Sequence, residues 1–271
     1  MTTQEPPVLE SLHGNWIEIS LNRPEKLNPL DESLHRALFG ALHKSAGDPA
    51  IRAILLTGHG RGFCAGQDLR ERDPRNWQEV PDLSRTVAQK YNPLVRLVRD
   101  SPKPVVCAVN GLVAGAGIGL ALACDIVLAA ESAVFHLAFA RIGLVPDAGT
   151  SWHLVHGLGP ARARALALTG GQLAAREAAE QGMIWQCLPD DRLLAEARAL
   201  VEKLANGSAS ALSLTKEVLR GACRNDFDSQ LDLEARMQGL AGRSPDFAEG
   251  VLAFLERRPA QFTARDGGET A

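Results

Sequence analysis

Two glycine-rich segments are the parts of this sequence whose residue types and spacing most directly suggest chemistry. The first covers residues 60–69 (GRGFCAGQDL) and the second covers residues 111–120 (GLVAGAGIGL), and an apolar run precedes each of them. Glycine lets the backbone turn tightly and approach a ligand closely. Two such turns can aim two backbone N–H groups at one point. That arrangement is an oxyanion hole, which stabilises negative charge on a carbonyl oxygen.

Asp147 is the acid whose surroundings best suit a catalytic base. Between residues 104 and 160 the acids are Asp125, Glu131 and Asp147. Asp125 begins an apolar strand, where we expect backbone N–H groups to hold it, and Glu131 lies in a polar turn. Asp147 lies between apolar residues and the start of a helix. The residues alone favour a helix N-cap at this position, and the alternative is a base in an apolar pocket.

Three other patterns in the sequence are weaker indications of chemistry. The second glycine segment does not have the G-x-G-x-x-G spacing of dinucleotide-binding loops, because its third glycine is Gly119. His153 and His156 could share a helix face, but no third metal ligand accompanies them. Residues 149–153 match only half of the G-x-S-x-G pattern of a nucleophile elbow.

Alternating strands and helices are expected to position the glycine segments and Asp147. We expect strands at residues 16–21, 51–57, 105–109, 125–130, 133–138 and 183–188. We expect helices at residues 31–46, 83–99, 114–123, 150–156, 160–168 and 174–181. The charged, proline-containing residues 70–81 read as a loop.

The order of these elements predicts an α/β domain over residues 1–190 and a helical region over residues 191–271. Helices without a sheet of their own need a surface to cover, which either the core or a neighbouring subunit supplies. The pattern alone leaves open whether the core is a doubly wound sheet or a spiral of ββα turns.

Composition limits the classes of protein to consider. The chain has 271 residues, of which 45% are hydrophobic and 23% charged, as in ordinary globular proteins with a core. Its net charge of −3 argues against a nucleic-acid partner, which would call for a basic surface. The five cysteines form no CxxC pair, so we expect reduced core residues in a cytoplasmic protein. Neither a secretory signal nor a membrane-spanning segment is expected.

Four motifs resemble those of the crotonase superfamily, also called the enoyl-CoA hydratase/isomerase superfamily. They are residues 22–28 (NRPEKLN), 62–69 (GFCAGQDL), 103–111 (KPVVCAVNG) and 125–127 (DIV). The resemblance extends over nearly the whole chain. It implies a crotonase-type spiral of ββα turns with a C-terminal helical trimerisation region. It also implies a homotrimer or a dimer of trimers, and an acyl-CoA thioester as the substrate.

The resemblance also implies roles for individual residues. The thioester carbonyl would lie between the backbone N–H groups of Gln67 and Ala116, and Asp147 falls where certain isomerases of the family carry a catalytic aspartate. The other residues implied to contact the acyl-CoA are Arg23, Lys26, Ala65, Gly66, Asp68, Leu69, Gly117 and Phe139. Arg23 and Lys26 would either approach the CoA phosphates or remain ordinary solvated side chains. Coenzyme A would be part of the substrate, and no metal or redox cofactor is expected.

Two positions separate this sequence from the hydratases of the family, which use two glutamates to position and activate water. Alignment places Gly119 and Phe139 at these positions, and neither side chain can transfer a proton. The resemblance therefore favours an acyl-CoA isomerase in which Asp147 moves a proton while the oxyanion hole holds the enolate. An enoyl-CoA hydratase is the alternative, and a non-catalytic acyl-CoA-binding homologue is the further alternative.

Within the family, the sequence resembles the isomerases that convert ring-1,2-epoxyphenylacetyl-CoA to an oxepin in bacterial phenylacetate breakdown. The matching segments are residues 91–95, 143–147, 182–186, 230–234, 240–244 and 249–251. Conversion of 3-enoyl-CoA to 2-enoyl-CoA in fatty-acid breakdown is the other predicted activity. Phe139, Val145 and Trp152 are expected to exclude water from the pocket. Thr150, which stands where the resemblance implies glycine, is expected to reshape the pocket floor.

Overall fold

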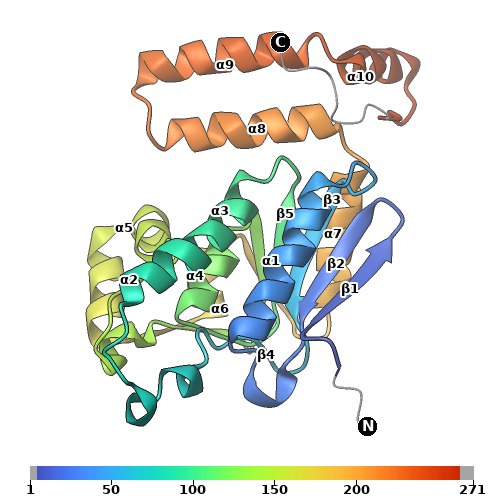
Figure 1. Ribbon diagram of the computed structural model, residues 1–271. Helices are drawn as coiled ribbons and strands as arrows, with labels where there is room; N and C mark the ends of the chain where they lie inside the picture. The colour runs from blue at the N-terminus through green and yellow to red at the C-terminus, as the bar shows by residue number, and fades with distance from the viewer. Residues whose placement is uncertain (1–4, 263–271) are drawn as a thin grey trace.

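The larger of two β-sheets forms the centre of the molecule in the computed structural model, which describes residues 5–262 (Figure 1). Its strands lie in the order β1 (Val8–His13), β2 (Trp16–Leu21), β3 (Ala53–Gly58), β5 (Val105–Val109), β7 (Ile126–Ala130) and β10 (Gln186–Leu188). β1 pairs antiparallel with β2, and the remaining strands run parallel. β3 and β5 are buried along their whole length, as is typical of parallel strands covered on both faces.

The smaller sheet explains why the two glycine segments come together. Its strands lie in the order β4 (Gly62–Cys64), β6 (Leu112–Ala114), β8 (Val134–His136) and β9 (Gln172–Ala174). β4 and β6 belong to the two glycine segments and pair in parallel. Successive strands alternate between the two sheets, from β3 to β4, β5 to β6 and β7 to β8, and helices follow each pair. This alternation is the predicted spiral of ββα turns.

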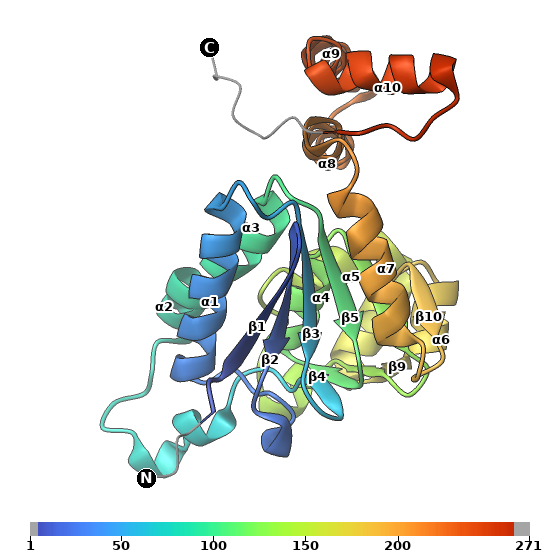
Figure 2. The same ribbon diagram turned by 90° about the vertical axis from the view of Figure 1, so that its right-hand side faces the viewer.

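Helices cover both faces of the larger sheet. In Figure 2, α1 and α3 lie on one side of its strands and α7 on the other. The helices up to this point are α1 (Glu32–Gly47), α2 (Leu83–Thr86), α3 (Asn92–Asp100), α4 (Ala116–Leu122), α5 (Thr150–Thr169), α6 (Ala175–Glu180) and α7 (Leu193–Ala205). Asp31 caps α1 by accepting a hydrogen bond from the backbone N–H of Leu34 at 2.8 Å, and the predicted apolar face of this helix is buried.

The last three helices form a separate layer beside the core (Figure 1). They are α8 (Ala209–Ala222), α9 (Phe227–Ala241) and α10 (Pro245–Glu256). Lys216 of α8 joins this layer to the core, because its ammonium donates to Asp125 Oδ2 at 2.6 Å and to the Lys103 carbonyl at 2.9 Å. The predicted boundary at residue 190 between the core and the helical region stays a prediction. The structure adds that α7, which follows this boundary, packs on the sheet of the core. Residues 263–271 of the predicted helical region lie outside the described residues.

Several elements differ from the sequence-based expectations. Strands β1, β4, β6 and β9 were not expected. β4, β6 and β9 have three residues each, which is too short to show a period of two, and apolar and polar residues do not alternate strictly in β1. Residues 70–81 include the short 3₁₀ turns Leu69–Arg72 and Pro74–Asn76. The expected helix over 83–99 contains a π-helical turn, Val87–Tyr91, just before Pro93, which has no N–H to continue a regular ladder. None of the helices within residues 5–262 is both long enough and apolar enough to span a membrane.

Candidate active site

The two glycine turns are in direct contact. Gly66 and Gly115 both have a positive φ, of +84° and +52° respectively, a conformation that glycine adopts without strain. A side chain on Gly66 would place its Cβ only 2.8 Å from the carbonyl oxygen of Ala114, and a Cβ on Gly115 would lie 3.7 Å from Gly66 Cα. The parallel pairing of β4 with β6 therefore brings the turns together, and glycine allows their close approach.

Within residues 5–262, each turn leaves one backbone N–H without a protein acceptor. Leu30 lies beside the first turn: its N–H donates to the Gly66 carbonyl at 2.7 Å, and its own carbonyl accepts from Asp68 N–H at 3.1 Å. The N–H of Gln67 lies between these two bonds, and within residues 5–262 it makes none of its own. Ala116 is the first residue of α4, where a helical N–H has no partner in its own helix. Both proposed oxyanion donors are thus available to a ligand.

Helix α4, which begins at Ala116, also contacts the loop that carries Asp147. A Cβ on Gly119 would lie 2.2 Å from the carbonyl oxygen of Ala148, so the loop that carries Asp147 rests directly on this glycine. Gly119 is three residues after Ala116, and residues at this spacing share one face of a helix. The loop therefore crosses α4 one turn away from the N–H of Ala116. Gly117 packs closely on β4, since its Cβ would lie 2.7 Å from the Cys64 carbonyl oxygen.

Asp147 is half-buried, and its Oδ1 atom is fully buried without a hydrogen-bond partner within the described residues. Gly149, not Asp147, occupies the N-cap position of α5, and no side chain caps this helix. The helix-cap interpretation of Asp147 is therefore wrong. Burial raises the pKa of Asp147 to about 6, because removing a carboxylate from water disfavours its charged form. A carboxylate with this pKa can both accept and return a proton near neutral pH.

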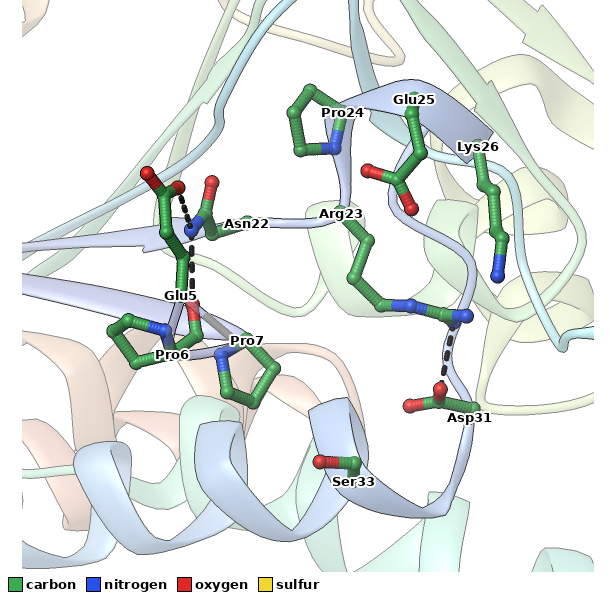
Figure 3. A pocket seen from close by; sticks show the side chains of 10 residues that line it. All are labelled: Glu5, Pro6, Pro7, Asn22, Arg23, Pro24, Glu25, Lys26, Asp31 and Ser33. Atoms are coloured by element: carbon green, nitrogen blue, oxygen red, sulfur yellow. Dashed lines mark hydrogen bonds and ion pairs between the residues drawn. The ribbon is translucent and has the colours of Figure 1, made fainter. Parts of the chain in front are cut away.

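Arg23 lies in a cavity of about 670 Å³ at the turn that follows β2, together with Lys26 (Figure 3). Its guanidinium is already paired with two acids, since Nη1 lies 3.0 Å from Asp31 and Nη2 lies 3.1 Å from Asp68. It also donates to the Pro29 carbonyl at 2.7 Å. Arg23 and Asp68 thus tie the first glycine segment to this turn. Lys26 is exposed and forms no ion pair within residues 5–262, which makes it the better candidate for a phosphate contact.

The remaining predicted contact residues differ in exposure. Ala65 is half-buried, Leu69 is 52% exposed and Phe139 is 5% exposed. Val145 and Trp152 are 77% and 45% exposed, so the expectation that they exclude water is wrong for the single chain. The reason is that both lie where the loop and the start of α5 face outward. Thr150, in contrast, is fully buried, and its Oγ1 has no partner within the described residues.

The two histidines that could have held a metal have other surroundings. His156 stacks on Trp152 with ring centroids 4.0 Å apart, and its Nδ1 bonds to the Trp152 carbonyl at 2.8 Å. Burial lowers the pKa of His153 to about 4, so this side chain is neutral at pH 7. Among residues 5–262, no group of three or more His, Cys, Asp or Glu side chains is placed to hold a metal ion.

Sequence reasoning gave no role to two residues that lie at the site. Asn28 is fully buried, and its side-chain amide donates to the carbonyls of Gly62 and His59 at 2.8 and 3.0 Å, which pins the 22–28 turn to the first glycine segment. Tyr91 is buried and lines a small cavity together with Gln67. The sequence does contain an indication of each residue: Asn28 is the last residue of the 22–28 motif, and Tyr91 is the single tyrosine of the chain.

Comparison with known proteins places the chain in a family. The sequence profile described as enoyl-CoA hydratase/isomerase matches residues 12–265. The chain is 48% identical over 258 residues to the 1,2-epoxyphenylacetyl-CoA isomerase of Escherichia coli strain K12, with 95% of this chain and 98% of the relative covered. It is 45% identical over 247 residues to a Rhodobacter capsulatus protein named "Probable enoyl-CoA hydratase", with 91% and 94% covered.

A solved structure shows the same fold. The crystal structure of an enoyl-CoA hydratase from Polaromonas sp. JS666 matches with a TM-score of 0.87 at 33% identity, and the match covers 94% of this chain and 99% of that one. The predicted crotonase-type fold is confirmed. Because the profile and these relatives cover nearly the whole chain, the protein belongs to the enoyl-CoA hydratase/isomerase family.

Proposed function

We propose that this protein is an acyl-CoA isomerase that works through a thioester enolate. Asp147 removes an acidic proton near the thioester, and the negative charge moves to the carbonyl oxygen between the N–H groups of Gln67 and Ala116. Asp147 then returns the proton elsewhere on the conjugated system. The observation that carries this proposal is the Oδ1 atom of Asp147, which is buried without a hydrogen-bond partner within residues 5–262, on a loop that contacts α4 one helical turn from Ala116.

Two substrates fit this reaction. The ring epoxide of 2-(1,2-epoxy-1,2-dihydrophenyl)acetyl-CoA is supported by the 48% identity to the Escherichia coli isomerase. Enolate formation would drive opening of its epoxide and expansion to the oxepin. A 3-enoyl-CoA would have its double bond moved into conjugation with the thioester by the same proton transfer. Neither reaction requires a metal or redox cofactor, and coenzyme A enters as part of the substrate.

Hydration is the second candidate activity, since relatives carry hydratase names. The two-glutamate mechanism needs acids at the positions of Gly119 and Phe139. A Gly119→Glu variant is expected to gain no crotonyl-CoA hydration and to lose at least tenfold of its isomerase activity. The reason is that any Cβ at this position lies 2.2 Å from the Ala148 carbonyl and must displace the Asp147 loop. Appearance of hydration with isomerisation unchanged would contradict this account.

The proposed base predicts a pH dependence. Burial raises the pKa of Asp147 to about 6, and the base is active only when deprotonated. The kcat/KM for isomerisation is therefore expected to level off above about pH 7 and to fall about tenfold per pH unit below pH 6. Initial rates between pH 4.5 and 8.5, limited to the range in which circular dichroism is unchanged, provide the measurement. A profile that stays flat down to pH 5 would exclude Asp147 as the titrating base.

The experiment that tests the proposal combines isomerisation with proton exchange in deuterated water. Wild type and Asp147→Asn would receive trans-3-enoyl-CoA, and crotonyl-CoA hydration would be assayed alongside. The proposal requires that the wild-type protein isomerises the trans-3-enoyl-CoA and exchanges its protons with the solvent. It also requires that Asp147→Asn loses both activities and that hydration of crotonyl-CoA stays negligible. If hydration dominates, or the variant is as active as wild type, the proposed function is wrong.

The proposal extends to assembly and location. We expect a homotrimer or a dimer of trimers in the cytoplasm, with the apolar side chains of α8 to α10 covered by neighbouring subunits. Phe227, Phe254 and Leu255 of this layer are largely exposed in the single chain. Light scattering after gel filtration is expected to give three or six times the chain mass of 29.0 kDa.

A further inference from the structure

Tyr91 supplies a hydroxyl that the mechanism above does not use. The residue is only 5% exposed, and its hydroxyl makes no hydrogen bond within residues 5–262. Although the residue is buried, its hydroxyl oxygen is not fully enclosed, so it faces space that water or a ligand can reach. A ligand in that space can accept a hydrogen bond from the phenol.

Tyr91 lies near both the first glycine segment and the loop that carries Asp147. On one side, it lines a cavity of about 20 Å³ together with Gln67. On the other side, Val95 lies one helical turn further along the same face, and its Cγ1 is 3.7 Å from the position of a Cβ on Gly149. Gly149 is two residues from Asp147, so this face of the helix borders the catalytic loop.

Two features fix the orientation of the Tyr91 ring. The residue ends the π-helical turn Val87–Tyr91, a type of distortion that is common at functional sites. The His35 ring meets the tyrosine ring edge-on, with centroids 5.8 Å apart, and His35 is itself bonded through Nε2 to the Lys90 carbonyl at 3.1 Å. The phenol is thus held in place before a substrate binds.

The phenol is a hydrogen-bond donor at neutral pH. Burial, and after it the nearby side chains of Cys64 and Asp147, raise the pKa of Tyr91 above its usual range. The hydroxyl therefore keeps its proton while Asp147 is ionised. A neutral donor beside an anionic base suits a substrate oxygen that must be held but not protonated.

We propose that Tyr91 donates a hydrogen bond to an oxygen atom in the acyl group, and that it thereby selects acyl-CoAs with a ring oxygen over hydrocarbon enoyl chains. This inference rests on the proposed function and names its substrate class. Sites built to hydrogen-bond a substrate group discriminate strongly against analogues without that group, because the buried partner is then left unpaired. The ring-epoxide substrate carries such an oxygen, and a 3-enoyl chain carries none.

A matched pair of unreactive ligands tests the inference by binding alone. Tetrahydropyran-2-ylacetyl-CoA and cyclohexylacetyl-CoA have the same shape and differ by one ring oxygen in place of a methylene. Their dissociation constants would be measured by calorimetry with wild type and with Tyr91→Phe, which keeps the ring against His35. We expect Tyr91→Phe to weaken the oxygen-containing ligand about tenfold and to leave the cyclohexyl ligand unchanged within about twofold.

A second variant serves as the matched control. Thr86→Val removes a hydroxyl from the same cavity, but this hydroxyl already accepts from Arg72 Nη2 at 3.0 Å. It is expected to leave the ratio of the two dissociation constants unchanged. Equal weakening of both ligands by Tyr91→Phe, or no effect on either, would overturn the inference.

The outcomes also separate this inference from the proposed function. If wild type binds neither CoA ester, the proposed acyl-CoA function fails and the inference fails with it. If Asp147→Asn isomerises as fast as wild type while Tyr91→Phe still discriminates between the ligands, the proposed base is wrong and the role of Tyr91 in specificity stands.

Discussion

Asp147→Asn is expected to lower kcat for isomerisation by about 10²–10⁴-fold, because it removes the group that accepts and returns the proton. The amide has nearly the same shape as the carboxylate, so KM for the acyl-CoA should change little. No other acid of the 104–160 region replaces it: Asp125 is paired with Lys216, and Glu131 is paired with Arg176 on the surface. Single-turnover rates with trans-3-enoyl-CoA would measure the loss.

The same variant is expected to be more stable than wild type. The folded state holds the pKa of Asp147 at about 6 against an ordinary value of 3.8, so the charged form opposes folding above pH 6. Because the carboxylate is partly open to water, we expect Asp147→Asn to raise the free energy of unfolding at pH 8 by about 1–2 kcal/mol. Below pH 3.8 wild-type Asp147 is protonated in both the folded and the unfolded state, so the difference should vanish.

A matched control makes both parts of this prediction specific. Glu131→Gln is the same change of charge at an exposed acid of the same region. It is expected to keep wild-type kcat and to alter the free energy of unfolding by less than about 0.5 kcal/mol. A variant at Asp147 that is both inactive and less stable than wild type would indicate a structural role for the carboxylate.

Gly66→Ala is expected to lower kcat by about 10²–10³-fold, the typical cost of losing one oxyanion donor. Gly66 precedes Gln67 and has a φ of +84°, which an alanine adopts only with strain. The new Cβ would also lie 2.8 Å from the Ala114 carbonyl, so the backbone N–H of Gln67 must move away from the N–H of Ala116. Rates and thermal unfolding would be measured on the same preparation.

The control for this prediction is a glycine with free space around it. Gly40 lies within α1, and a Cβ there meets nothing within 4 Å. Gly40→Ala should keep wild-type activity and gain up to about 1 kcal/mol of stability from the better helix propensity of alanine. Wild-type turnover by a folded Gly66→Ala protein would show that the oxyanion donors lie elsewhere.

Local sequence patterns were sufficient to predict the fold class and the two glycine segments, and they left two interpretations of Asp147, a helix cap or a base. These features are local: periods of 2 and 3.6 residues reveal strands and helices, and motifs are read within a few neighbouring positions. Features that are very short, or that depend on residues far apart in the sequence, could not be predicted in this way. The three-residue strands β4, β6 and β9 carry too little pattern to be recognised, and no local pattern reveals that Arg23 is paired with Asp31 and Asp68.

The position and environment of Asp147 depend on tertiary packing. An aspartate just before a helix satisfies the sequence signature of a cap, but Gly149 occupies the cap position, and within residues 5–262 the Oδ1 atom of Asp147 is buried without a partner. The contacts that produce this arrangement join Gly119 to Ala148 and Gly66 to Ala114. They depend on how β4, β6 and α4 pack together. Burial and desolvation arise from such long-range packing, so no local pattern could show that the pKa of this carboxylate is raised.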